Sequence, residues 1–284
     1  AEGKKYILKN MIPGEFEYQL DLQKQLSSCP NVRAVIDTIQ GDEMFIYPFL
    51  TGDLLHLSKK LSSKDKINVL RCALRGLADI HERDILHNDI KPDNIMVDYD
   101  ESASSQMKIN SVRVADLDDT VIVPPGKWLR GPLCGNAIWR SPESWCRSRQ
   151  NQASDIFSFG IVMIYVMVDE MVFRVSNSQL EAEDSWRYIL RRHISYFADE
   201  DGLNGLLEHI GTENPYYERL VALVGSFKPG DQRQPFESWD YVEPDLKELV
   251  GKMTSLDPRR RITAKEALRH RWFSQVDLDQ SSED

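Results

Sequence analysis

The chain has 284 residues, of which 41% are hydrophobic and 28% are charged, a composition typical of a folded globular protein with one large domain or two smaller ones. Its formal net charge of -10 argues against a general polyanion-binding protein, because nonspecific affinity for nucleic acid comes from clustered lysine and arginine. The four cysteines form no CxxC pair and the longest apolar run, residues 156–168, is too short to span a bilayer, so neither a disulfide framework, a zinc site nor a membrane helix is expected.

These features together predict an intracellular protein, cytoplasmic or nuclear, that acts without nucleic acid or membrane. A reducing compartment fits cysteines that are scattered through the chain. The first residues, AEGKK, contain no signal peptide, and the lack of an initiator methionine indicates a trimmed or partial chain.

The first fifty residues predict a small β-rich layer with one helix. Strands are expected in KYILKN (5–10), VRAVIDTI (32–39) and EMFIYPFL (43–50). After a break at Pro13-Gly14, the segment EFEYQLDLQKQL (15–26) has the apolar spacing of a helix.

From residue 51 onward the pattern is mainly helical. A long amphipathic helix is expected after a capping signal at Ser62 and Asp65, with apolar residues at Ile67, Leu70, Leu74 and Leu77. Further helices are expected at 154–168, 181–195, 243–253 and 263–270. The polar stretch 98–111 is expected to be a surface loop, and the acidic residues after Phe273 a tail.

A dense group of polar residues follows the long helix. The segment HNDIKPDN (87–94) holds a histidine, two aspartates, a lysine and two asparagines between apolar runs. It could be no more than a turn before a strand, because Asn, Asp and Pro are turn formers. Segments elsewhere in the chain are needed to distinguish a simple turn from a functional loop.

Several segments of the chain resemble sequence motifs of one protein family. HNDIKPDN resembles the catalytic loop of the eukaryotic protein kinase family, and ADLD (115–118) resembles its metal-binding Asp-Phe-Gly turn. Other segments resemble further kinase motifs in the family's order, namely YILK (6–9), WRSPE (139–143), DIFSFG (155–160) and DPRRRITAKEAL (257–268). One such match is weak evidence, but an ordered series over nearly the whole chain is strong.

The resemblance implies an α+β, protein-kinase-like bilobal fold. Its small β-rich N-lobe is expected to be truncated or degraded and to cover residues 1–50. The larger, mainly helical C-lobe is expected to cover residues 51–275, with an acidic tail at 276–284. The sequence leaves the oligomeric state open.

The resemblance also implies a chemistry, the transfer of the γ-phosphate of ATP to a serine or threonine hydroxyl of a protein substrate. By resemblance, Asp89 accepts or orients the proton of that hydroxyl, and Lys91 steadies the transferring phosphate. Asn94 and Asp116 hold Mg²⁺ through oxygen ligands, and Lys9 contacts the α- and β-phosphates.

Other matching positions are structural or bind the base. Glu143 and Arg261 are expected to form a buried ion pair, and Asp155 to brace the catalytic loop. The hinge is expected at YPFL, where adenine would pair with the backbone of Pro48 and Leu50.

The N-terminal part departs from the family's pattern. Only eight residues precede Lys9, so the glycine-rich loop that covers the ATP phosphates is missing from the sequence. Gln19 stands where the family has the helix glutamate that pairs with this lysine. In addition, Leu117-Asp118 replaces Phe-Gly, and Asn136 replaces the threonine of the substrate-binding segment.

Three functions stay open at this level. An active Ser/Thr-type kinase is supported by the complete polar set, and Lys91 two positions after Asp89 argues against a tyrosine kinase. A pseudokinase that serves as a binding or scaffold module is supported by the degraded N-lobe. A small-molecule kinase of the choline or aminoglycoside type shares the HxDxxxxN loop, but such enzymes generally lack Lys91 and the SPE and DIFSFG segments. A glycine-rich turn encoded upstream of Ala1 would favour the active kinase over the pseudokinase.

Control by phosphorylation of the activation segment is not expected. Asn88 replaces the arginine that would bind a phosphate there, and a neutral amide supplies no cation. Between Asp116 and Arg140 the only hydroxyl side chain is Thr120, which lies beside two aspartates. The sequence therefore predicts a single state of this loop.

Overall fold

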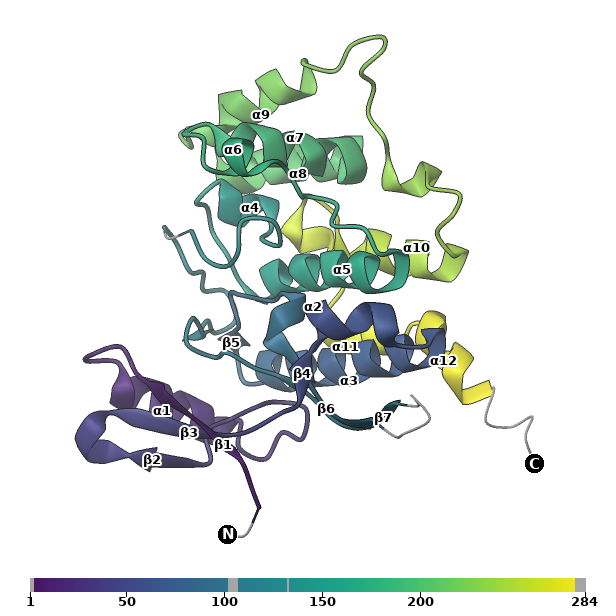
Figure 1. Cartoon of the computed structure of the whole chain (residues 1–284). Helices are drawn as coiled ribbons and strands as arrows, with labels where there is room; N and C mark the ends of the chain where they lie inside the picture. The colour runs from purple at the N-terminus through teal and green to yellow at the C-terminus, as the bar shows by residue number, and fades with distance from the viewer. Residues whose placement is uncertain (1–2, 102–106, 132, 279–284) are drawn as a thin grey trace. The chain divides into compact units, whose positions relative to one another are not determined.

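The structure is a computed structural model that describes residues 3–101, 107–131 and 133–278 (Figure 1). Its contacts divide the chain into two compact units. The first unit contains Ala1–His87 and Pro92–Ile122, and the second contains Asn88–Lys91 and Val123–Asp284. The predicted lobes at 1–50 and 51–275 follow a different boundary from these units and stay predictions. The acidic tail predicted at 276–284 also stays a prediction, and residues 279–284 lie outside the described part of the chain.

The first unit begins with an antiparallel sheet in the order β1-β3-β2, formed by β1 (Tyr6–Asn10), β3 (Met44–Pro48) and β2 (Asp37–Ile39). The small β-rich layer with one helix is confirmed. Of the strand expected at 32–39, only its last three residues form a strand.

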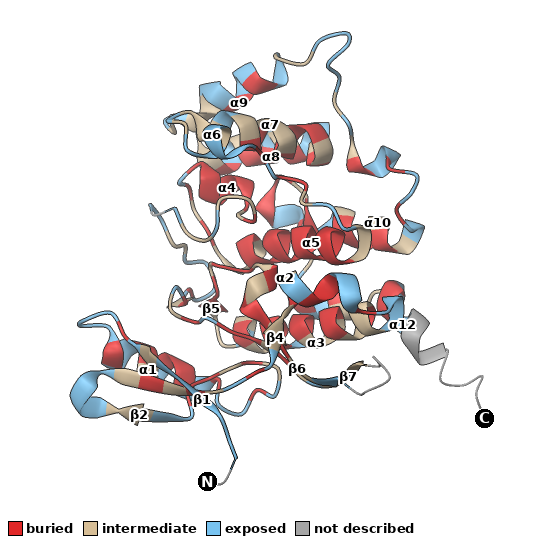
Figure 2. Ribbon diagram, viewed as in Figure 1, coloured by how far each residue is buried: buried red, intermediate tan, exposed pale blue. Residues whose placement is uncertain are grey.

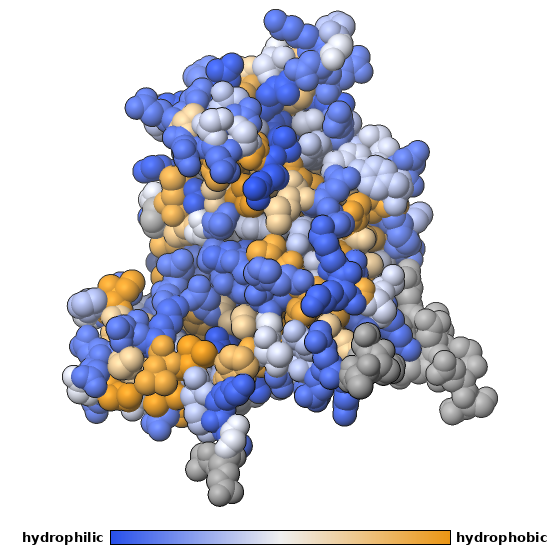
Figure 3. Space-filling model, in the orientation of Figure 1, coloured by the Kyte–Doolittle hydropathy of each residue, from blue (hydrophilic) through white to orange (hydrophobic). Residues whose placement is uncertain are grey.

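Helix α1 (Phe16–Gln25) supplies one face of this layer's core. Phe16 packs on Phe45 of β3 with a distance of 5.0 Å between ring centroids, and Met11, Val35 and Tyr47 complete the cluster. The opposite face of the sheet is apolar but exposed, with Tyr6 and Leu8 41% and 51% exposed. Figure 3 shows an orange, hydrophobic patch over β1 and β3.

A second sheet of the first unit packs on the long helix α3 (Ser63–His81). Its order is β4-β6-β7, from β4 (Gly52–Asp53), β6 (Ile95–Glu101) and β7 (Met107–Val114). Ser62 caps α3 by accepting a hydrogen bond from the Asp65 N–H at 3.1 Å, as predicted. The predicted apolar face of α3 is buried, and Gly76 is required there because a Cβ would lie 2.2 Å from the Asn31 carbonyl oxygen.

Shorter elements complete the first unit. Strands β5 (Ile85–Leu86) and β8 (Val121–Ile122) pair antiparallel with each other. The remaining short helices are α2 (Leu54–Leu57), η1 (Gln40–Asp42), η2 (Ser58–Lys60) and η3 (Pro92–Asn94).

The surface loop predicted at 98–111 is wrong for most of its length. Residues up to Glu101 belong to β6 and residues from Met107 belong to β7, with residues 102–106 outside the described part of the chain. The two strands pair antiparallel, and their distal residues are largely exposed. Exposed strands carry polar side chains, so composition alone suggested a loop.

The second unit is helical. Its helices are α4 (Pro142–Trp145), α5 (Gln152–Val168), α6 (Asn177–Leu180), α7 (Ser185–Phe197), α8 (Glu200–Ile210), α9 (Tyr216–Val224), α10 (Pro244–Met253), α11 (Ala264–Leu268) and α12 (Arg271–Leu278), with short helices η4 (Phe236–Ser238) and η5 (Pro258–Arg260). Helix α5 is buried on every side from Ser154 to Val166 and packs against α10, as its continuous red ribbon in Figure 2 shows. No helix in the described ranges is both long and apolar enough to cross a membrane.

The helices predicted for the second unit are confirmed with shifts of a few residues at their ends. The helix expected at 181–195 begins only at Ser185. Helix α8 had no sequence signal because Gly202 and Gly205 lower its helix propensity. The Cβ that an alanine would place at position 205 would lie 2.3 Å from Asp257 Oδ2, so close packing requires glycine at this position.

Candidate active site

In the first unit, Asn94 and Asp116 lie at the same end of the β6–β7 hairpin. The register pairs Ile95 with Val114, and the Ala115 N–H donates to the Asn94 carbonyl oxygen at 2.8 Å. These contacts bring the two predicted metal ligands to adjacent positions of the backbone. The buried His87 ring contacts the Ala115 carbonyl oxygen through Nε2 at 3.0 Å, which supports the same turn.

The backbone of Asp116 is strained. Its φ angle is 61°, in the left-handed region that non-glycine residues seldom adopt. Such a conformation costs about 1–3 kcal/mol and persists where the surroundings impose it, most often at functional sites. The surrounding contacts therefore hold the backbone of this turn in one conformation at the end of the hairpin.

Lys9 of β1 meets two carboxylates of this turn. Its Nζ atom lies 2.5 Å from Asp116 Oδ1 and 2.6 Å from Asp118 Oδ2. Partial burial lowers the pKa of Lys9, but the hydrogen bonds and charges of the two aspartates outweigh it, so the net pKa is raised. Lys9 is therefore a permanent cation beside the predicted metal ligand Asp116.

Helix α1 contributes a neutral amide to this cluster. Gln19 is 2% exposed, and its Nε2 atom donates to the Asp118 carbonyl oxygen at 2.9 Å. Gln19 Oε1 and Asp118 Oδ1 are both buried without a hydrogen-bond partner among the described residues. The sequence left open which group pairs with Lys9. In the structure, its partners are Asp116 and Asp118 of the turn and not a residue of α1.

The predicted hinge follows β3. Leu50 is buried, and its N–H donates to no group in the described parts of the chain, so this donor is available to a base. The Pro48 carbonyl oxygen accepts a hydrogen bond from Arg33 Nε at 2.9 Å. Burial lowers the pKa of Arg33, whose guanidinium also lies 5.4 Å from the centroid of the Tyr47 ring. Arg33 thus competes for the acceptor that an adenine amino group would use.

In the second unit, Asp89 and Lys91 form a close pair. Asp89 Oδ2 lies 2.6 Å from Lys91 Nζ, with only 9% and 17% of the two side chains exposed. The other carboxylate oxygen, Asp89 Oδ1, accepts a hydrogen bond from the Asn136 N–H at 2.9 Å. Both oxygens of Asp89 are therefore oriented by the protein.

The backbone around this pair is fixed from two sides. Asp155 of α5 accepts a hydrogen bond from the Asn88 N–H at 3.0 Å, which confirms its predicted role as a brace of the loop. Asn88 has a φ angle of 70°, and Gly135 packs so closely that a Cβ would lie 2.5 Å from the Asn88 carbonyl oxygen. Arg140 in turn donates to the Gly135 carbonyl oxygen. Only glycine fits at position 135.

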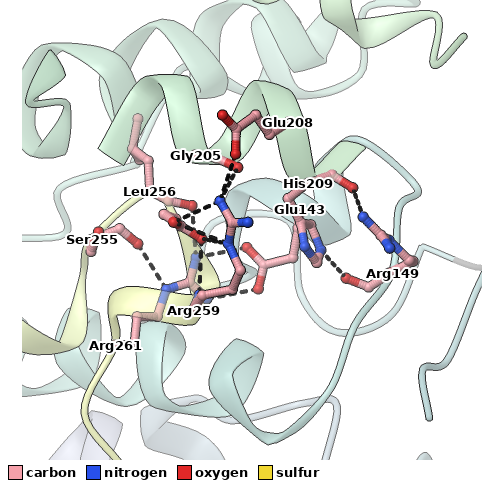
Figure 4. Close-up of polar contacts among 10 residues, drawn as sticks. Glu143, Arg149, Gly205, Glu208, His209, Ser255, Leu256, Arg259 and Arg261 are labelled. Atoms are coloured by element: carbon pink, nitrogen blue, oxygen red, sulfur yellow. Dashed lines mark hydrogen bonds and ion pairs between the residues drawn. The ribbon is translucent and has the colours of Figure 1, made fainter. Parts of the chain in front are cut away.

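Glu143 and Arg261 form the predicted buried ion pair in the second unit (Figure 4). Two hydrogen bonds of 2.7 Å join the guanidinium to the two carboxylate oxygens, and both side chains are fully buried. Ser154 donates a further hydrogen bond of 2.6 Å to Glu143. Burial alone would raise the pKa of Glu143, but the Arg261 charge and these hydrogen bonds lower it to about 2.

The segment that follows Asp116 is anchored within each unit. In the first unit, Thr120 is fully buried and donates to the Leu117 carbonyl oxygen at 2.6 Å. In the second unit, Leu129 and Gln150 exchange two backbone hydrogen bonds of 2.9 Å, and the Trp128 ring packs on His209. The single loop state stays a prediction.

The residues at the hairpin end suit a divalent cation bound together with a nucleotide. Mg²⁺ prefers oxygen ligands and usually takes one or two carboxylates plus phosphate oxygens. Asn94 and Asp116 supply an amide and a carboxylate oxygen there. In the described residues, no group of three or more His, Cys, Asp or Glu could hold a metal by itself, so phosphate oxygens would have to complete the coordination.

Two candidate functional residues, Asp118 and Arg33, were not predicted from the sequence. Asp118 stood out only as a replacement for glycine, although an added acid next to a metal-binding turn is a signal that could have been followed. Arg33 lies in a predicted strand with no distinguishing pattern, and its contact with Pro48 depends on how the sheet folds.

Comparisons with known proteins agree with this geometry. A family model described as "Protein kinase domain" matches residues 8–273. The calcium/calmodulin-dependent protein kinase type II subunit delta of Oryctolagus cuniculus is 24% identical over 251 residues, covering 86% of this chain and 38% of that protein. The calcium/calmodulin-dependent protein kinase type II alpha chain of Drosophila melanogaster is 24% identical over 252 residues, covering 87% of this chain and 38% of that protein.

A solved structure is also similar. The crystal structure of the yeast RNA Pol II CTD kinase CTDK-1 complex matches with a TM-score of 0.72 and 15% sequence identity, covering 95% of this chain and 84% of that one. This likeness concerns the fold. The chain spans 38% of the length of the curated relatives that it matches.

Proposed function

Because the chain belongs to the protein kinase domain family, we propose that it transfers the γ-phosphoryl group of ATP to serine and threonine hydroxyls of protein substrates. The observation that carries this proposal is the Asp89–Lys91 pair, with its 2.6 Å contact and its backbone support from Asn136. A bare turn before a strand would not need two converging, largely buried charges. The matched family model argues for protein over small-molecule substrates.

Asp89 is proposed as the group that takes up the proton of the substrate hydroxyl. The Asn136 N–H and the Lys91 ammonium each bind one of its oxygens, so the carboxylate is already oriented before a substrate arrives. A positioned acid–base group of this kind contributes about 10²–10⁴-fold to rate. Lys91, as a neighbouring cation, is proposed to offset negative charge that develops on the transferred group.

The first unit is proposed to hold the nucleotide and Mg²⁺. Asn94 and Asp116 would bind the cation, Lys9 the phosphates, and the free Leu50 N–H the base. When bound, Mg²⁺-ATP supplies the phosphoryl group and neutralises the charge of the phosphates. Along the chain, only Pro92 and Asp93 separate Lys91 from Asn94, so Asn94 lies on the same short loop as Asp89 and Lys91.

A reducing intracellular compartment, cytoplasmic or nuclear, is proposed as the place of action. All four cysteines are free thiols, and Cys146 is buried. Burial raises the pKa of the Cys146, Cys72 and Cys29 thiols, which keeps them protonated and slow to oxidise.

The proposal is tested by the identity of the phosphate acceptor. The chain is incubated with Mg²⁺ and γ-labelled ATP and with three degenerate peptide pools whose only hydroxyl amino acid is serine, threonine or tyrosine. We expect label in the serine and threonine pools and none in the tyrosine pool. Asp201→Asn, which removes an exposed carboxylate of α8, serves as a matched control and should keep full transfer. Nucleotide binding without transfer to any pool would instead favour a pseudokinase.

A further inference from the structure

The acidic side chains of helix α1 play no part in holding Lys9. Glu17 and Asp21 are exposed on α1, and Asp21 lies 3.4 Å from Lys24 of the same helix. The residue of α1 that contacts the turn is the neutral Gln19. Both carboxylates bound to Lys9 come from residues 116–118 instead.

This arrangement creates a conflict for Asp116. A carboxylate that coordinates a divalent cation cannot keep a close ion pair with an ammonium in the same direction, because the two cations repel each other. If Asp116 were the only anchor of Lys9, each binding of the metal would release the Lys9 side chain. A free lysine has considerable rotamer entropy and would hold phosphates poorly.

Asp118 removes this conflict. Its Oδ2 atom lies 2.6 Å from Lys9 Nζ, and its side chain is only 24% exposed. The Gln19 amide donates to the Asp118 carbonyl oxygen at 2.9 Å and thereby fixes the backbone from which this carboxylate extends. Lys9 can therefore keep one carboxylate partner while Asp116 turns to another ligand.

We propose that Asp118 is a positioning residue that holds Lys9 in place, so that Asp116 can bind the cation without releasing Lys9. The proposal rests on the proposed function, because it assumes that Asp116 and Lys9 both serve the Mg²⁺-nucleotide. It also assigns a role to Gln19, whose neutral amide is suited to the carbonyl oxygen of Asp118 where a glutamate would be repelled.

The test compares Asp118→Asn and Asp118→Glu with the parent chain in a binding assay. A fluorescent ATP analogue is titrated at several Mg²⁺ concentrations, and thermal melting checks that each variant folds. In Asp118→Asn, Asp116 is the one carboxylate left beside Lys9 among the described residues, so the Mg²⁺ concentration for half-maximal binding should rise about tenfold. Asp118→Glu keeps the charge and should restore most of the parent value. Asp42→Asn, which removes an exposed carboxylate of the same unit, should have no effect.

A double-variant comparison shows whether Asp118 acts through Lys9. In a Lys9→Met background, Asp118→Asn should cause no further change in the half-maximal Mg²⁺ concentration. An unchanged Mg²⁺ dependence in Asp118→Asn, or an equal effect with and without Lys9, would overturn the proposal while leaving the proposed function intact. If the parent chain binds no nucleotide at any Mg²⁺ concentration, the proposed function fails and this proposal fails with it.

Discussion

Replacing Glu143 by glutamine is expected to destabilise the second unit by about 3–5 kcal/mol, because Arg261 would then keep a buried charge without a counter-charge. The pKa of Glu143 supports this magnitude. It falls from 4.5 to about 2 in the folded protein, since the Arg261 charge and hydrogen bonds overcome the opposing effect of burial. This difference corresponds to roughly 3 kcal/mol at neutral pH.

The sign of the pH dependence follows from the same pKa. Because the folded pKa is lower than the unfolded one, the contribution of Glu143 is fully present above about pH 4.5 and is lost as the pH falls towards 2. The parent chain should therefore lose stability over this range, and Glu143→Gln should lose less.

The assay is urea unfolding followed by tryptophan fluorescence, since Trp145 and Trp272 are both buried in the second unit. The double variant Glu143→Leu/Arg261→Met serves as the control, because it removes both charges and should be more stable than Glu143→Gln. A loss of less than about 1 kcal/mol in Glu143→Gln would refute the reasoning, because that is the size expected of an exposed pair.

Three further predictions follow from single contacts. Burial lowers the pKa of His193 to about 4, so the unfolded chain binds a proton first as the pH falls. The free energy of unfolding should therefore drop by roughly 3 kcal/mol between about pH 6.5 and 4. Urea unfolding of His193→Phe should show a flatter pH profile in that range, and a profile parallel to that of the parent chain would contradict this. Arg33→Ala removes the hydrogen bond to the Pro48 carbonyl oxygen and leaves this acceptor to the adenine base. Calorimetry should then show ATP affinity raised by about fivefold, the equivalent of one hydrogen bond. Weaker ATP binding would count against the hinge assignment. Thr120→Ala should leave the rate of phosphoryl transfer within about twofold of the parent rate, because the buried hydroxyl only supports the turn. A tenfold rise of this rate in Thr120→Glu would show instead that this position is a phosphorylation switch.

Elements with a strong local pattern could be predicted from the sequence. Helix α5 follows from the longest apolar run of the chain, residues 156–168, and α3 from the spacing of apolar residues after Ser62. The Glu143–Arg261 pair was expected only from the family's motifs, yet its geometry is as expected. Segments with regular periodicity or complete motifs therefore form the helices and contacts that were predicted from them.

Features that depend on contacts between distant segments could not be predicted. The exposed part of the β6–β7 hairpin has a polar composition like that of a loop, and only pairing of the two strands reveals it. The role of Asp118 depends on the left-handed turn at Asp116 and on the approach of Lys9 from β1. Neither the turn nor this approach has a local sequence signal, because both are set by tertiary packing.

The most direct test of the proposed kinase activity compares Asp89→Asn with the parent chain, measuring phosphoryl transfer and Mg²⁺-ATP affinity on the same samples. Asp89 is proposed to act on the substrate hydroxyl, and its two carboxylate oxygens contact Lys91 and the Asn136 N–H. We therefore predict that transfer falls by about 10²–10⁴-fold while the affinity stays within about twofold. A transfer rate within a few-fold of the parent would contradict the account, because the Asp89–Lys91 pair would then have no part in the chemistry.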